Sequence, residues 1–452
     1  MPTYDLLIRH GNVVTPEGVT VADVAVADGR IAAVGPDLTG TAREEIDARG
    51  LHLFPGVVDV HVHFNEPGRT GWEGWATGSG ALAAGGGTLA VEMPLNASPP
   101  TLDSTSFAAK RAAAETSSVV DFALWGGLTP SNLDRLEELA DAGVVGFKAF
   151  MSDSGVDDFP AADDDTLYAG MTVAARLGLP VAVHAEDDAT TRRLTEAARA
   201  GGRAGWGDYL RSRPVGAETA AIGRAIALAD AAGCALHVVH VSTGAGLALV
   251  AQARSRRQDV SAETCPHYLV LTEDDQERLG AAAKCAPPLR PAAEVESVWA
   301  GVATGAVQTV GSDHSPAPAD LKGGADVFAV WGGIAGVQST LPLMLTEGHH
   351  RRGIPLSSLA ALLAGNPAAR LRLPGKGRIE PGYDADFALV DLGREWILAR
   401  DDLLDRHRLS PYVGRAFKGA IRRTFVRGRT VFAAGKVVVA GGGRLVLPAS
   451  RR

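Results

Sequence analysis

Cysteine is scarce in this chain, which excludes a fold held together by disulfide bonds. The sequence of 452 residues contains only 3 cysteines, Cys234, Cys265 and Cys285. An odd number of widely spaced cysteines gives no disulfide framework. We expect them to be small buried hydrophobic residues of a protein in a reducing cytoplasm, with a metal-binding cysteine as the alternative.

Long apolar runs and an excess of basic charge are also missing. The Ala/Gly-rich stretch over residues 81–90 is too short to span a bilayer, and the first five residues lack the basic start and apolar core of a signal peptide. The formal net charge is −8, with acidic and basic residues interspersed. We therefore expect a cytoplasmic protein that binds neither membranes nor nucleic acids.

Hydrophobic residues make up 46% of the chain, which is enough for a large core. Both ends read as short strands separated by Gly and Asp turns, at residues 5–9, 12–14, 21–26 and 29–35 and again after Pro374. Neither end alone would bury much surface. We predict that residues 1–55 and 375–452 fold together as a small discontinuous β-sandwich domain.

Between these ends, apolar runs alternate with stretches rich in Ala, Leu, Glu and Arg. The eight candidate strands are residues 57–63, 88–93, 119–124, 144–150, 180–184, 235–241, 260–264 and 307–312. Eight such strands with helical connections predict a (β/α)8 TIM-like barrel over residues 56–374. An open doubly wound sheet is the alternative, but it would not make neighbours of the first and last strands.

Six residues with the chemistry of a metal site lie on or just beyond these runs: His61, His63, Lys148, His184, His240 and Asp313. The carboxyl ends of barrel strands share one face, so these side chains can meet there. His61 and His63 are two residues apart and point the same way. His237 and His240 point to opposite faces, and we choose His240 because it is nearer the end of its strand.

This set of side chains predicts a pair of divalent ions. Imidazoles with one carboxylate suit zinc first, with cobalt, manganese or iron as alternatives to it. An ammonium has no lone pair, but a buried lysine loses its proton readily, and the neutral amine can add carbon dioxide. The resulting N6-carboxylated Lys148 could bridge two ions, whereas the simpler reading is an ion-paired strand lysine. Two such ions would activate a water for hydrolysis of an unactivated C–N bond, with Asp313 as the catalytic proton carrier.

At these residues the chain resembles the amidohydrolase superfamily, in the branch of dihydroorotases, hydantoinases (dihydropyrimidinases) and allantoinases. The matching stretches are residues 59–74, 92–96, 146–148, 263–268, 284–290, 312–316, 331–336 and 410–415. The likeness is greatest to the allantoinases and covers nearly the whole chain. It implies hydrolysis of the hydantoin ring of allantoin to allantoate in purine catabolism, with a hydantoinase acting on other cyclic imides as the alternative.

Asn65 separates these families, because dihydroorotases resemble this chain but carry an arginine there that pairs with a substrate carboxylate. Allantoin is neutral, and Asn65, Asn96 and Ser315 offer donors and acceptors for it. The alternative is that the two asparagines stabilise loops and that Ser315 caps the turn that follows it. Gly71 and Ala286 depart from the family pattern, where a larger polar residue and a serine are common. The resemblance also implies a homo-oligomer, a tetramer in many relatives, and it makes a metal-free scaffold of the same fold the remaining rival.

Overall fold

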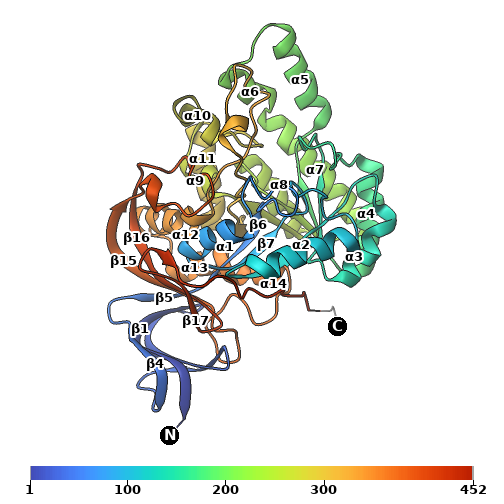
Figure 1. The fold of residues 1–452 in the computed structure, drawn as a ribbon. Helices are drawn as coiled ribbons and strands as arrows, with labels where there is room; N and C mark the ends of the chain where they lie inside the picture. Colours follow the sequence, from blue (N-terminus) through green and yellow to red (C-terminus); the bar gives the residue numbers. More distant parts are fainter. Residues whose placement is uncertain (1, 450–452) are drawn as a thin grey trace.

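Strands from both ends of the chain form one nine-stranded sheet in the computed structural model, which describes residues 2–449 (Figure 1). Its order is β18-β17-β16-β15-β5-β1-β2-β3, with β4 beside β1. The strands are β1 (Thr3–Thr15), β2 (Gly18–Ala27), β3 (Arg30–Gly35), β4 (Thr41–Asp47), β5 (His52–Pro55), β15 (Phe387–Ile397), β16 (Ala416–Val426), β17 (Arg429–Ala433) and β18 (Lys436–Val437). β5 joins the two halves, since it pairs in parallel with β1 and antiparallel with β15.

The nine-stranded sheet covers its own apolar core, which contains Leu6, Val24, Phe387 and Phe425. We propose that residues 1–55 and 375–452 form one domain. Residues 1 and 450–452 of that division lie outside the described residues.

Parallel strands form the second part of the molecule, in two sheets of order β6-β7-β8 and β14-β13-β12-β11-β10-β9. They are β6 (Val57–Val62), β7 (Gly87–Glu92), β8 (Asp121–Leu124), β9 (Gly126–Gly127), β10 (Phe147–Phe150), β11 (Val181–His184), β12 (Leu236–Val238), β13 (Val260–Thr264) and β14 (Thr309–Val310). Only Trp125 separates β8 from β9, so the two are one interrupted strand. A parallel bridge between Val62 and His314 closes the ring. The predicted barrel is confirmed, and each of its predicted strands overlaps an observed one.

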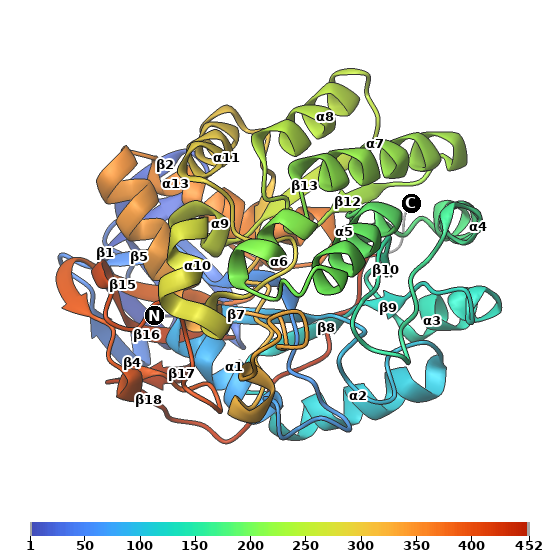
Figure 2. The same cartoon turned by 90° about the horizontal axis from the view of Figure 1, so that it is seen from above.

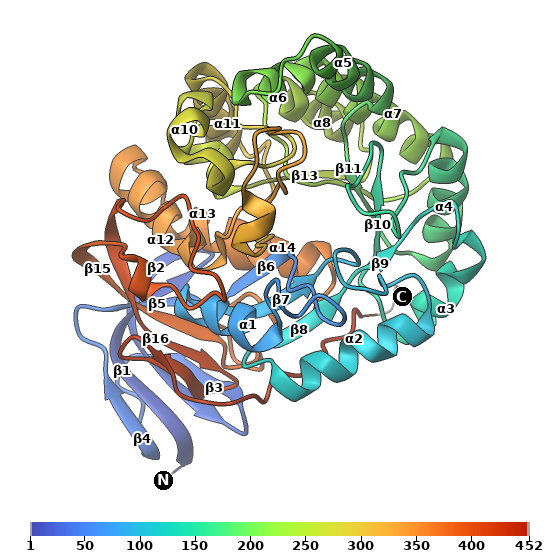
Figure 3. The same cartoon turned by 45° about the horizontal axis from the view of Figure 1, so that its top comes forward.

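Helices surround this ring, as the view in Figure 3 shows most clearly. They are α1 (Trp75–Ala84), α2 (Ser104–Ser117), α3 (Leu136–Ala142), α4 (Asp164–Leu177), α5 (Asp188–Ala200), α6 (Trp206–Ser212), α7 (Val215–Ala232), α8 (Gly244–Ser255), α9 (Pro266–Val270), α10 (Glu273–Leu279), α11 (Ala292–Thr304), α12 (Thr340–Leu343), α13 (Leu356–Ala360) and α14 (Asn366–Arg370). α7 buries Ile222, Ala225, Ile226 and Ala229, a spacing typical of one helix face. α5 and α6 project beyond the others at the top of Figure 1 and lie over the ring in Figure 2.

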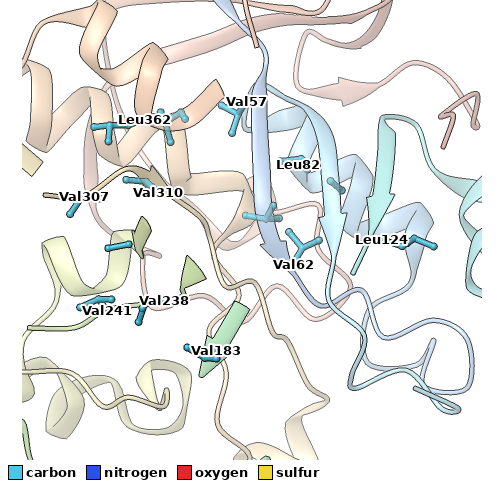
Figure 4. Close-up of a cluster of buried hydrophobic side chains, with 14 of the residues drawn as sticks. Val57, Val62, Leu82, Leu124, Val183, Val238, Val241, Val307, Val310 and Leu362 are labelled. Carbon is cyan, nitrogen blue, oxygen red and sulfur yellow. The ribbon is translucent and has the colours of Figure 1, made fainter. Parts of the chain in front are cut away.

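Valine and leucine side chains fill the space between the strands and these helices (Figure 4). Val62 of β6, Leu124 of β8, Val183 of β11 and Val310 of β14 are all fully buried. Burial of each such side chain contributes about 1.5–3 kcal/mol, so the strand ends are held by a rigid core. None of the helices within residues 2–449 is long and apolar enough to cross a bilayer.

Buried charges join the barrel to the nine-stranded sheet. Lys376 contacts Asp121 of β8 at 2.6 Å and Asp386, just before β15, at 2.7 Å. Arg427, which follows β16, also pairs with Asp121. Residues near the C-terminus lie along the start of β8, where the Phe122 amide donates to the carbonyl oxygen of Arg444 at 3.0 Å.

Candidate metal centre

His61, His63 and Asp313 meet where β6 and the chain after β14 reach the same end of the barrel. The Nε2 atoms of His61 and His63 lie 3.2 and 3.5 Å from Asp313 Oδ1. Their other ring nitrogens are held from behind, His61 Nδ1 by Glu263 at 2.7 Å and His63 Nδ1 by the Leu95 carbonyl oxygen at 3.0 Å. These contacts fix the orientation of both rings, so that the Nε2 atom of each faces Asp313.

His184 and His240 form a second pair, at the ends of β11 and β12. His184 Nδ1 lies 3.0 Å from His240 Nε2, and His184 Nε2 is held by Glu186 at 2.8 Å. Burial lowers the pKa of both imidazoles, well below the usual value for His240. Both rings are therefore neutral at pH 7 and able to share their lone pairs with a cation.

Lys148 of β10 has a completely buried amine. Its Nζ has no hydrogen-bond partner within the described part of the chain. Burial lowers the pKa of Lys148 to about 7, with the Asp313 and Glu263 carboxylates only partly opposing it. Leaving such a group unpaired costs free energy, so this amine fits a position that is modified or bound in the working protein.

Asp313 is the ionised member of this set. Burial raises the pKa of its carboxyl, but His61 and His63 outweigh that effect, so the pKa lies well below its usual range. A carboxylate surrounded by imidazole rings suits a divalent cation. This donor set and the unpaired Lys148 amine together make a candidate site for divalent metal ions.

Left-handed backbone occurs at three of the predicted residues. The φ angles are 42° at His240, 45° at Asp313 and 65° at Asn65. Residues other than glycine adopt this conformation at a cost of about 1–2 kcal/mol each, and such strain clusters at functional sites. Here it turns these residues out of the regular strand path at the barrel's open end.

Cys265 also lies beside the centre. Its sulfur and the ligand atoms of His267 and Asp313 lie within 4.8 Å of one another. Burial raises the pKa of the thiol well above its usual value. The alternative of a metal-binding cysteine therefore concerns this residue.

Glu263, Glu186 and Asp59 support the centre, and sequence reasoning missed all three. Glu263 contacts both His61 and His237 and its pKa falls to about 2, because these histidines outweigh its burial. Asp59 Oδ1 accepts hydrogen bonds from the amides of His61 and Ser312. The available signal for Glu263 and Asp59 was a carboxylate in the middle of an apolar strand.

A pocket of about 530 Å³ opens above these side chains. One wall is formed by α5 and Arg213, and another by residues 328–333, which belong to an irregular segment of residues 316–335. Lys284 Nζ donates to the carbonyl oxygen of Val327 in this segment at 2.8 Å, and the rings of Trp331 and Trp72 lie 4.7 Å apart. The pocket is large enough for a small heterocyclic substrate.

The three predicted substrate-binding residues are not equivalent in the structure. Asn96 and Ser315 line the pocket and contact each other, with Asn96 Nδ2 donating to Ser315 Oγ at 3.4 Å. Asn65 is fully buried and donates to the Pro316 carbonyl oxygen at 3.4 Å, so it lies behind this wall. Ala286 lines the pocket, whereas Gly71 is exposed and its carbonyl oxygen accepts a hydrogen bond from His407.

Comparison with known proteins agrees with this geometry. Residues 52–431 match the model of the amidohydrolase family. Curated relatives named allantoinase include one from Rubrobacter xylanophilus, 61% identical over 99% of this chain and 98% of its own length, and one from Deinococcus radiodurans, 54% identical over 99% and 100%.

Solved structures of hydantoinases share the fold. The L-hydantoinase (dihydropyrimidinase) from Arthrobacter aurescens superposes with a TM-score of 0.95 at 36% identity, over 98% of this chain and 100% of that one. A D-hydantoinase from a Bacillus species, reported with evidence for mercury inhibition, gives 0.92 at 31% over 99% and 100%. The resemblance to cyclic amidohydrolases noted in the sequence is confirmed, and the chain belongs to the amidohydrolase family.

Proposed function

We propose that this protein is an allantoinase, which hydrolyses the hydantoin ring of allantoin to give allantoate. The observation that supports allantoin as the substrate is the 61% identity, over nearly the full length of both chains, to a relative named allantoinase. The chemistry of the site is consistent with it, because the pocket lining includes two neutral hydrogen-bonding side chains, Asn96 and Ser315, beside the candidate metal centre.

We propose that the six predicted residues hold two divalent ions, with zinc first and cobalt, manganese or iron as alternatives. His61, His63 and Asp313 would hold one ion, His184 and His240 the other, and N6-carboxylated Lys148 would bridge them. The buried, unpaired amine of Lys148 supports this assignment. Bound divalent ions supply Lewis acidity, which activates water and polarises a carbonyl group.

Asp313 has the position and charge of a catalytic base. One of its oxygens faces His61 and His63, and the other can accept a proton from the attacking water and deliver it to the leaving ring nitrogen. Asn96 and Ser315 would orient the neutral ring from the pocket wall. Asn65 would support the pocket wall indirectly, by donating a hydrogen bond to the carbonyl oxygen of Pro316.

A hydantoinase or dihydropyrimidinase is the second candidate, favoured by the TM-score of 0.95 to the Arthrobacter enzyme. The deciding experiment measures turnover of allantoin, hydantoin, dihydrouracil and dihydroorotate by purified protein supplied with zinc, cobalt or manganese and with bicarbonate. We expect metal-dependent opening of allantoin well above the other three rings. Opening of dihydrouracil with allantoin left intact would contradict the proposal while leaving the metal centre in place.

We also propose that the protein works in the cytoplasm as a homo-oligomer, with a tetramer as the expected state. Sedimentation of the purified protein measures this directly, and a monomer at micromolar concentration would contradict it.

A further inference from the structure

Arg213 lies between α6 and α7 and lines the pocket without being one of the predicted ligands. Two contacts fix its place. Its backbone carbonyl oxygen accepts a hydrogen bond from Arg290 at 2.6 Å, and its guanidinium lies over the ring of Tyr209, 5.8 Å from the centroid. The side chain is only 18% exposed, so its charge needs a partner.

That partner is Glu186, which connects Arg213 to the metal centre. Arg213 Nη1 donates to Glu186 Oε2, and the same oxygen lies 2.8 Å from His184 Nε2. Within residues 2–449, Glu186 is the only hydrogen-bond acceptor of the Arg213 guanidinium. Glu186 is fully buried, and a buried carboxylate stays ionised and fixed only when it is paired.

His184 differs in this respect from the other candidate ligands. His61 rests on Glu263, which is shared with a second histidine, and His63 rests on a backbone carbonyl. Only His184, within the described residues, rests on a carboxylate that is itself paired with an arginine of the pocket wall. Its orientation therefore depends on a residue from another loop.

We infer that Arg213 is a positioning residue that acts through Glu186 on His184. The Arg213–Glu186 pair keeps the proton of His184 on Nε2. The lone pair of His184 Nδ1 then faces His240, whose Nε2 atom lies 3.0 Å away, and the two nitrogens can bind the same ion. This inference rests on the metal centre assigned under the proposed function. Hydrogen-bonding partners of ligand histidines commonly change metal affinity or activity by about 10–100-fold.

The test compares Arg213→Met, Arg213→Lys and Glu186→Gln with the wild-type protein. Arg192→Met is the matched control, because Arg192 lines the same pocket and pairs with Asp188 at 3.4 Å. Each protein is stripped of metal and titrated with cobalt(II), and both the affinity for each of two ions and the absorption spectrum are recorded. Urea unfolding of the metal-free proteins is measured alongside.

We expect Arg213→Met and Glu186→Gln to weaken the binding of one cobalt ion by about 10–100-fold and to change its spectrum. Arg213→Lys should restore part of the affinity, and Arg192→Met should match the wild type in cobalt affinity and absorption spectrum. Wild-type affinity and spectrum in Arg213→Met, with a higher KM, would identify a substrate contact and overturn the inference. So would a loss of stability in the metal-free variant large enough to account for the weaker binding.

The same titration distinguishes a failure of this inference from a failure of the proposed metal centre. A wild-type protein that binds no cobalt would refute the metal centre, and the inference would fall with it. A wild-type protein that binds two ions, with unchanged binding in all three variants, would refute the role of Arg213 alone.

Discussion

At the scale of single residues, Lys148 has an unusual environment. Its amine is buried, has no hydrogen-bond partner among residues 2–449, and has a pKa lowered to about 7 by burial. A neutral amine is the form that adds carbon dioxide, so modification should proceed at physiological pH. Protein prepared without bicarbonate should therefore hold less metal than protein prepared with it.

Replacement of Lys148 tests this directly. Lys148→Ala should lose a bridging ligand, with a fall in turnover of roughly a thousandfold, or about 4 kcal/mol in the barrier. Added acetate should restore part of the metal binding, because it supplies a carboxylate in the vacated space. Metal analysis and turnover measure both effects. Full metal content in Lys148→Ala without acetate would contradict a bridging role.

The sequence allowed the candidate ligands to be predicted, but not the residues that hold them. Four histidines and one aspartate at predicted strand ends can be recognised in the sequence alone, because strand ends share one face of a barrel. Glu186 and Arg213 do not, since their contact depends on how the chain after α6 turns back over the pocket. Asn65 shows the same limit, because nothing in the sequence places its side chain behind Pro316.

At the scale of elements, the segment of residues 316–335 forms a wall of the pocket with little regular structure. Lys284 holds it through the carbonyl oxygens of Val327 and Val330, and Arg199 holds it through Asp326 at 3.1 Å. The Lys284 side chain is nearly buried, and burial lowers its pKa to about 7. This lysine is the main polar anchor of the wall.

Lys284→Met should loosen this segment without emptying the metal centre. Each hydrogen bond contributes about 0.5–1.5 kcal/mol, so we expect a KM raised roughly tenfold and faster amide hydrogen exchange within residues 316–335. Lys436→Met, in the exposed β17–β18 hairpin, is the control. A raised KM with unchanged exchange would show that Lys284 contacts the substrate instead.

Among the elements, the barrel strands could be predicted because buried runs bounded by helical sequence are a clear signal. The details that failed are local. The sequence predicts two short strands at residues 5–9 and 12–14, but both belong to the single strand β1, whose register shifts between Ile8 and Gly11. His10 lies in that irregularity, a β-bulge, with a φ of 57°. No residue pattern in the sequence predicts this bulge.

At the scale of the whole molecule, Lys376 and its carboxylates hold the barrel and the nine-stranded sheet together. Burial raises the pKa of the Asp121 carboxyl, but Lys376 and Arg427 outweigh it, so the pKa lies below the usual value. An acid with a lowered pKa stabilises the fold above its unfolded-state pKa, and that contribution is lost as the pH falls. The link should therefore weaken in acid.

Asp121→Asn should lower the free energy of unfolding by about 3–5 kcal/mol at pH 7, since it leaves the buried Lys376 and the partly buried Arg427 short of a partner. The difference from wild type should shrink as the pH falls below about 4, the usual carboxyl range. Urea unfolding between pH 3 and pH 7 measures it. Lys418→Met, which removes the exposed pair with Glu395, should change stability by less than about 1 kcal/mol. A difference independent of pH would contradict the assignment.

The place of β5 between β1 and β15 has a consequence for the growing chain on the ribosome. β5 ends at Pro55, but the strand that covers its edge begins only at Phe387, after the whole barrel has been translated. Until then, one edge of the N-terminal strands offers unpaired amide and carbonyl groups to any other nascent chain. Slow synthesis of the barrel should thus favour aggregation through β5, and chaperones that shield strand edges should raise the yield of folded protein.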